Sequence, residues 1–159
     1  MISECEGGLE KFMGRGTALI TGASGGIGEA FAKLFAQEGF NLILTARSED
    51  KLNELSKSLN GTETVVVSAD LSKTQGIEKL IEEVEEKVES VDVIVNNAGM
   101  TAEGPFHELK EQDIEKILTL NMVATVKITH HFLKAMRKRG SGRILNVASV
   151  AAFHPFPSM

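Results

Sequence analysis

A glycine-rich turn carries residue types that could bind a phosphate. It reads Thr21-Gly22-Ala23-Ser24-Gly25-Gly26-Ile27-Gly28 and stands between an apolar, strand-like run and a helical pattern. Because glycine has no Cβ, backbone N–H groups in such a turn can approach a phosphate closely, and the positive end of the following helix points to the same place. The alternative is that the glycines only mark a tight bend. The order of strand, turn and helix favours a dinucleotide cradle.

A basic residue follows the next strand-like run. At this position an NAD site carries Asp or Glu, which accepts a hydrogen bond from the ribose 2′-OH. Ala46 cannot accept that bond, whereas the planar guanidinium of Arg47 suits a 2′-phosphate. The plainer interpretation is that Arg47 is a solvent-exposed residue before a helix. We interpret the pair as favouring NADP over NAD.

The elements that must position these residues alternate along the chain, as in βαβ units with a parallel sheet. Strands are predicted at 17–20, 41–45, 64–68, 91–95 and 143–148, and their apolar content without strict alternation indicates burial on both faces. Helices are predicted at 29–38, 51–59, 77–88 and 111–139, with Gly39 and Gly140 at helix ends. The predicted fold is α/β, the N-terminal five-strand portion of a Rossmann-type doubly wound parallel sheet over residues 16–159, after an N-terminal tail at 1–15.

The glycine spacing, Thr-Gly-x-x-x-Gly-x-Gly, resembles that of the short-chain dehydrogenase/reductase family. Further matches stand in the family's order and span nearly the whole chain from Gly16: Asp70-Leu71, Asn96-Asn97-Ala98-Gly99, Asn121 and Ser149. The resemblance implies an NADP-dependent oxidoreductase that transfers hydride between nicotinamide and a carbonyl or alcohol substrate. With the turn and Arg47 it predicts these NADP-binding residues: Gly22, Ser24, Gly26, Ile27, Gly28, Arg47, Asp70, Leu71, Asn97, Ala98 and Gly99.

Several of these residues also have plainer interpretations. The resemblance places Ser24 at the 2′-phosphate and Asp70 and Leu71 at the adenine, but Ser24 is also a common turn residue and Asp70 could cap the next helix. Asn96 to Gly99 could be only a turn. We favour its family role, steadying the sheet and running alongside the nicotinamide ribose, because it follows an apolar strand at the carboxyl edge of the sheet.

Asn121 and Ser149 are the predicted catalytic residues. Asn121 stands among apolar residues of the long predicted helix, where a backbone group or water could satisfy its amide. The resemblance implies instead that Asn121 helps to hold a water in a proton relay. Ser149 could simply close the fifth strand. By resemblance, its hydroxyl bonds the substrate oxygen and stabilises charge during hydride transfer.

The family's proton donor is a tyrosine followed four residues later by a lysine, and this sequence contains no tyrosine. The family places that tyrosine about thirteen residues after the serine, as general acid. The chain ends ten residues after Ser149. We therefore expect a truncated chain that is not competent alone, whose fifth strand is left as a sheet edge with exposed apolar surface. The full-length form is expected to be an active homo-oligomer.

The composition limits the classes of partner that we expect the protein to bind. With 17 basic and 22 acidic residues the net charge is -5, without the basic stripe that nucleic-acid binding needs. Cys5 is the only cysteine, the first residues are acidic, and no apolar run nears the length of a membrane span. We expect a cytoplasmic protein with no membrane partner. The histidines lack metal-ligand spacing, so no metal site is expected.

Three functions compete on this evidence. The favoured one is the NADP-dependent oxidoreductase, with a small carbonyl or alcohol compound as substrate. The second is a dinucleotide-binding module or sensor without catalysis. The third is a flavodoxin-like α/β protein whose glycines are only structural.

Overall fold

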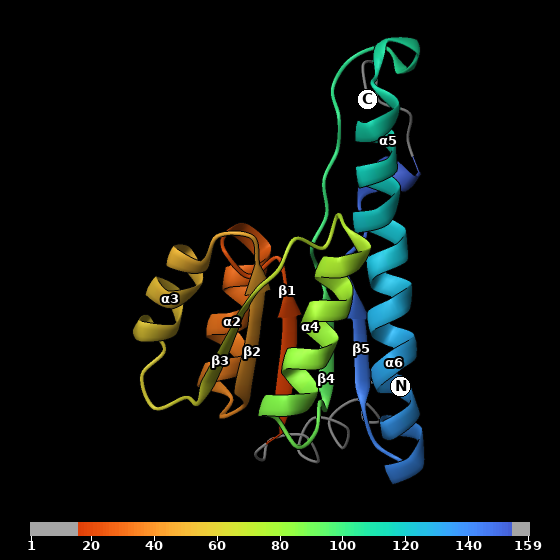
Figure 1. The fold of residues 1–159 in the computed structure, drawn as a ribbon. Helices are drawn as coiled ribbons and strands as arrows, with labels where there is room; N and C mark the ends of the chain where they lie inside the picture. The colour runs from red at the N-terminus through yellow and green to blue at the C-terminus, as the bar shows by residue number, and fades with distance from the viewer. Residues whose placement is uncertain (1–15, 154–159) are drawn as a thin grey trace, which may run out of the picture.

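One parallel sheet organises the fold (Figure 1). The computed structural model describes residues 16–153, so the predicted tail at 1–15, Cys5 and His154 lie outside the described residues. The strands are β1 (Thr17–Thr21), β2 (Asn41–Ala46), β3 (Thr64–Ser68), β4 (Val93–Asn96) and β5 (Arg143–Asn146). They lie in the order β3-β2-β1-β4-β5, and every neighbouring pair is parallel.

Helices cover both faces of this sheet. The long ones are α2 (Gly26–Gln37), α3 (Glu49–Ser58), α4 (Thr74–Lys87), α5 (Glu111–Leu118) and α6 (Thr125–Arg139), with short turns η2 (Phe106–Glu108), η3 (Thr119–Ala124) and η4 (Val150–Ala152). Side chains alternate along each strand. Leu19 of β1 therefore joins a core cluster with α4 and α6. Ala18 and Ile20 join the opposite cluster, with α2 and α3. This confirms the predicted doubly wound Rossmann-type fold.

The chain changes direction across the sheet at β1. From β1 it adds β2 and then β3 on one side, and it then places β4 and β5 on the other. The register brings the carboxyl ends of the strands together, because Thr21 lies opposite Thr45 and Ile20 lies opposite Val95. In open parallel sheets a ligand crevice forms at this edge, where the strand order reverses.

The ends of the fourth and fifth strands differ from the prediction. The fourth begins at Val93 rather than at residue 91. The Asp92 N–H still donates to the Thr17 carbonyl at 2.8 Å, but the Thr17 N–H donates to the Asp92 carboxylate, also at 2.8 Å, where a longer backbone ladder would need a carbonyl. The fifth strand ends at Asn146 rather than at 148, although the Val147 N–H still donates to the Asn96 carbonyl at 2.9 Å.

The long helix predicted at 111–139 has the expected bounds but is not uniform. Thr119–Ala124 forms a π-helical turn between α5 and α6. Gly140 follows α6 with φ +72°, and Gly39 follows α2 with φ +79°, so both glycines adopt the left-handed conformation that ends a helix.

The outer strand β5 is open to solvent. All four of its residues are exposed, and Ile144 and Leu145 are 37% and 41% exposed. Within residues 16–153 no further strand pairs with it. This confirms the expected sheet edge with apolar surface.

Candidate functional site

The loop after β4 holds the glycine-rich turn in place. The Thr21 hydroxyl accepts hydrogen bonds from the N–H groups of Asn97 at 2.9 Å and Ala98 at 3.0 Å. It also donates to the Val95 carbonyl at 3.3 Å. In return, Nδ2 of Asn97 donates to the carbonyls of Thr21 at 3.0 Å and Gly22 at 3.3 Å. The two loops therefore form one unit at the carboxyl edge of the sheet.

The glycines of the turn divide into two kinds. A Cβ on the buried Gly28 would lie 2.3 Å from the Gly22 carbonyl oxygen and 2.6 Å from Asn97 Nδ2, so only glycine fits there. Gly22 itself has φ +67°. In contrast, a Cβ on Gly25 or Gly26 would meet nothing within 4 Å. The first kind packs α2 against β1, and the second leaves open space above the turn.

A cavity of about 570 Å³ lies at this edge of the sheet. Many of the residues predicted to bind NADP line it: Gly22, Ser24, Arg47, Asp70, Leu71, Asn97, Ala98 and Gly99. The cavity lining does not include Gly26, Ile27, Gly28, Asn121 or Ser149. Gly28 lies beneath the turn, and the Ile27 side chain is 59% exposed.

Sequence reasoning missed the other lining residues, which are Gly25, Ala46, Ser48, Lys51, Ala69, Ser72, Met100 and Leu120. Most of them adjoin a predicted site residue in the sequence, and that adjacency was the available signal. Lys51 had a different signal. It stands at the start of the helix predicted at 51–59, just after the loop that carries Arg47.

The end of the cavity at β2 is positively charged. Arg47 is exposed and follows β2, and its carbonyl accepts a hydrogen bond from the Ser68 hydroxyl at 3.2 Å. Within the described part of the chain, no carboxylate forms an ion pair with Arg47 or with Lys51. Neighbouring Ala46 is only 8% exposed and offers no hydrogen-bonding side chain to this end of the cavity.

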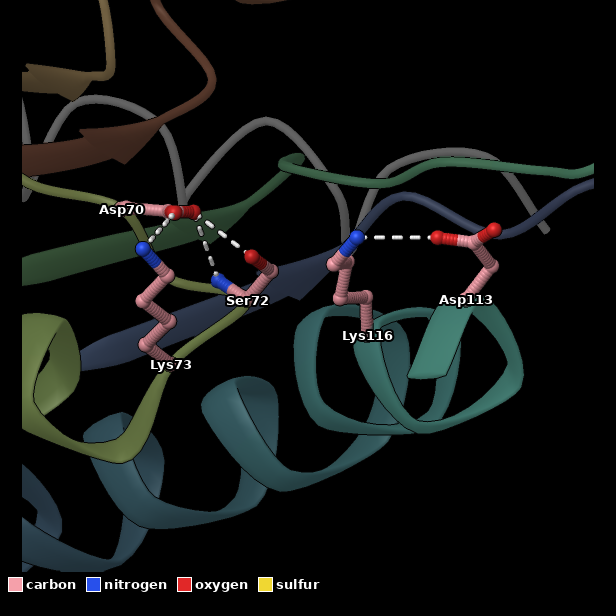
Figure 2. Close-up of polar contacts among 5 residues, drawn as sticks. All are labelled: Asp70, Ser72, Lys73, Asp113 and Lys116. Atoms are coloured by element: carbon pink, nitrogen blue, oxygen red, sulfur yellow. Dashed lines mark hydrogen bonds and ion pairs between the residues drawn. The ribbon is translucent and has the colours of Figure 1, made fainter. Parts of the chain in front are cut away.

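Asp70, which follows β3 and lines the cavity, has its own partners (Figure 2). Its carboxylate accepts from the Ser72 hydroxyl at 2.7 Å and the Ser72 N–H at 3.2 Å, and it pairs with the Lys73 ammonium at 3.5 Å. Partial burial raises the pKa of Asp70, but the Ser72 bonds and Lys73 together outweigh it and hold the pKa below its ordinary value. Asp70 therefore does not cap α4, whose first turn has no side-chain cap.

The backbone at Asp70 is also packed closely. A Cβ on Gly76 in the first turn of α4 would lie 2.1 Å from the Asp70 carbonyl oxygen. The ion pair of Lys116 and Asp113 on α5, also drawn in Figure 2, has a length of 2.8 Å and involves no residue of the cavity lining. The lysine lowers the pKa of Asp113.

Asn121 lies in the π-helical turn and binds the backbone of the loop after β4. Its Nδ2 donates to the Met100 carbonyl at 2.8 Å, and its Oδ1 accepts from the Met100 N–H at 2.9 Å. The side chain is thus satisfied by a backbone group, and Met100 lines the cavity. The π-helical turn places Asn121 against this loop.

Ser149 stands after β5, between that strand and η4. Its hydroxyl accepts a hydrogen bond from the Ala151 N–H at 3.1 Å, and the residue is exposed. It shares no hydrogen bond with Asn121 or with the cavity lining. The catalytic role of Ser149 stays a prediction.

Among residues 16–153 no three His, Cys, Asp or Glu side chains are placed to hold a metal ion. His131 instead lies 2.7 Å from the Glu85 carboxylate, which joins α6 to α4. None of the helices in the described part of the chain is long and apolar enough to cross a membrane.

Comparison with known proteins gives a consistent result. The profile of the short chain dehydrogenase family matches residues 16–159. The uncharacterized oxidoreductase YvrD of Bacillus subtilis is 38% identical over 142 residues, which cover 89% of this chain and 54% of that protein. The chain spans about half the length of the curated relatives it matches.

Solved structures agree. L-sorbose reductase from Gluconobacter frateurii, complexed with NADPH and L-sorbose, superposes with a TM-score of 0.87 at 32% identity, covering 92% of this chain and 57% of the reductase. A short-chain dehydrogenase from Sphingobium yanoikuyae in complex with NADPH gives a TM-score of 0.82 at 33% identity, covering 88% and 56%. With the glycine-rich turn, the sheet order and the cavity at its carboxyl edge, these matches establish that the chain belongs to the short-chain dehydrogenase family of oxidoreductases.

Proposed function

We propose that this protein is an NADP-dependent oxidoreductase that transfers hydride between nicotinamide and a carbonyl or alcohol substrate. The observation that carries the cofactor assignment is the unpaired Arg47 at the end of β2, in the lining of the cavity beside the apolar Ala46. A guanidinium can form charge-assisted hydrogen bonds with a 2′-phosphate. The neutral 2′-hydroxyl of NAD offers no negative charge for it to pair with. The NADPH complexes of the similar structures support the same choice.

The residues present fit this cofactor. Gly25 and Gly26 leave space above the start of α2, where a diphosphate would meet backbone N–H groups. Arg47 and Ser24 would hold the 2′-phosphate, and Asp70 with Leu71 would border the adenine. Asn97-Ala98-Gly99 would run beside the nicotinamide ribose, on a loop that Asn121 braces through Met100.

The catalytic assignment rests on Ser149 and Asn121. When bound, the nicotinamide supplies or accepts the hydride. The hydroxyl of Ser149 would donate a hydrogen bond to the substrate oxygen and so stabilise negative charge that develops there. Asn121 would act from the helix side, where it fixes the loop at Met100 and, by the family's pattern, supports the water of a proton relay.

The cofactor assignment is tested by replacing Arg47 with Ala and titrating NADPH and NADH by fluorescence. Loss of a charge-assisted hydrogen bond is expected to lower NADPH affinity about tenfold and leave NADH affinity unchanged. Arg137→Ala is the matched control, because Arg137 is exposed on α6 and does not line the cavity. An unchanged ratio of the two affinities in Arg47→Ala would show that the NADP assignment is wrong.

A second candidate is dinucleotide binding without catalysis. The observation in its favour is that predicted nucleotide-binding residues line the cavity, whereas the predicted catalytic residues Asn121 and Ser149 do not. Incubation with NADPH and a panel of ketones and aldehydes separates the two. Binding without consumption of NADPH supports the second candidate, consumption supports the first, and no binding by folded protein at millimolar NADPH contradicts both.

A further inference from the structure

The cavity has a second lining cation outside the family pattern quoted above. Lys51 stands in the first turn of α3 and lines the cavity together with Arg47 and Ser48. Long helical side chains lean back over the preceding turn, toward the N-terminus of their helix. From its place in α3, Lys51 therefore extends toward the end of β2, where Arg47 lies.

Lys51 shares the first turn of α3 with two acidic residues, Glu49 and Asp50, but forms an ion pair with neither. Glu54, one turn further along α3, is at a spacing that often gives an ion pair, yet no carboxylate among the described residues lies within ion-pair distance of Lys51. A cation in the first turn of a helix is also unfavourably placed relative to the helix dipole. The one acidic residue of the lining, Asp70, is already engaged by Lys73 and Ser72. The cavity lining therefore combines two cations that have no ion pair among the described residues with one carboxylate that is already paired.

We propose that Lys51 is a specificity-determining residue that, with Arg47, binds the 2′-phosphate on the adenosine ribose of the dinucleotide. This inference rests on the proposed function and adds a residue to it. A phosphate monoester carries close to two negative charges at neutral pH. The guanidinium of Arg47 supplies a directional fork and the ammonium of Lys51 a compact point charge, so the pair matches that charge better than either alone. Lys51 therefore contributes to the affinity for the 2′-phosphate and does not contribute to the affinity for the adenosine or the diphosphate.

The test compares two lysines of the same helix. Lys51→Met keeps the aliphatic stem and removes the charge, and Lys57→Met does the same in the last turn of α3, outside the cavity lining. Each purified variant is titrated with adenosine 2′,5′-bisphosphate and with adenosine 5′-monophosphate, which differ only in the 2′-phosphate. Lys51→Met is expected to lower the affinity for the bisphosphate about fivefold, as for a solvent-exposed charge pair, and to leave the affinity for the monophosphate unchanged.

The outcomes separate this inference from the proposed function. An equal effect of Lys51→Met on the two nucleotides, or an equal effect of Lys57→Met on the bisphosphate, would overturn the role of Lys51. If the unmodified protein binds neither the bisphosphate nor NADPH, the proposed function fails and the inference fails with it. A third outcome separates the two. If the unmodified protein prefers NADPH and Arg47→Ala removes that preference, but Lys51→Met does not weaken binding of the bisphosphate, only the Lys51 inference is wrong. A shallower salt dependence of bisphosphate binding in Lys51→Met supports the direct contact.

Discussion

Replacing Gly28 with Ala sets two effects of opposite sign against each other. Gly28 lies within α2, where alanine is a better helix former than glycine by about 1 kcal/mol. Helix propensity alone therefore predicts a more stable protein. The structure predicts the reverse, because the added Cβ would lie 2.3 Å from the Gly22 carbonyl oxygen.

The size of the effect follows from that contact. Non-bonded atoms of this kind rest at about 3.5 Å, so α2 and the turn must separate by about 1 Å. Overpacking of this kind costs about 1–3 kcal/mol. The same shift strains the bond from Asn97 Nδ2 to the Gly22 carbonyl, which contributes about 1 kcal/mol. After the gain in helix propensity, we expect a net loss of about 2 kcal/mol, or a fall of about 4–8 °C in Tm.

The assay is thermal and urea unfolding in the absence of nucleotide, followed by circular dichroism. Gly25→Ala is the matched control in the same turn. A Cβ there meets nothing within 4 Å, and its φ of 166° is extended backbone that any residue adopts. We expect the Tm of Gly25→Ala to match that of the unmodified protein. A Gly28→Ala protein that melts at or above the unmodified Tm would refute the reasoning, since propensity would then outweigh the contact.

Two further predictions concern polar contacts. Asp70→Asn removes a carboxylate whose pKa is lowered in the folded protein. The carboxylate therefore stabilises the fold at pH values above its unfolded-state pKa of about 3.9. This contribution is lost as the pH falls through the lower folded-state pKa. The difference in unfolding free energy between the two proteins, from urea titrations, should be constant near neutral pH and shrink at acid pH; a difference that persists undiminished in acid would contradict this. Arg139→Ala should lower the free energy of unfolding by about 1.5 kcal/mol, because the guanidinium forms an ion pair with the Asp92 carboxylate at 3.2 Å and donates a hydrogen bond to the Val91 carbonyl. Arg137→Ala, in the same exposed last turn of α6, should have almost no effect, and equal losses in the two variants would count against the Arg139 contact.

The sequence predicted the features that depend on local pattern. Apolar runs and helical periods gave the order of the elements, and the glycines gave the turn at β1, because both signals lie in neighbouring residues. Strand ends were less accurate. The start of β4 depends on Asp92 bonding to Thr17, a residue 75 positions away, and no local pattern reports that contact.

Only the part of the site that follows strand ends could be predicted from the sequence. Residues beside a strand end, such as Arg47 and Asn97, could be found because parallel strands bring their carboxyl ends to one edge. Lys51 was missed because it reaches the cavity from a helix, and the π-helical turn was missed because Asn121 bonds Met100 across space. Ser149 was assigned by family resemblance, and its role awaits experiment.

The central place of β1 has a consequence for synthesis of the chain. On the ribosome, β2 and β3 emerge soon after β1 and can pair on one side of it, while its other side stays open until β4 follows. The glycine-rich turn is translated early, but the Asn97 side chain that bonds it is 76 residues further on. A nascent chain therefore carries an unbraced turn until Asn97 has been made. Competence to hold a nucleotide should arise in one step, when the loop after β4 leaves the exit tunnel.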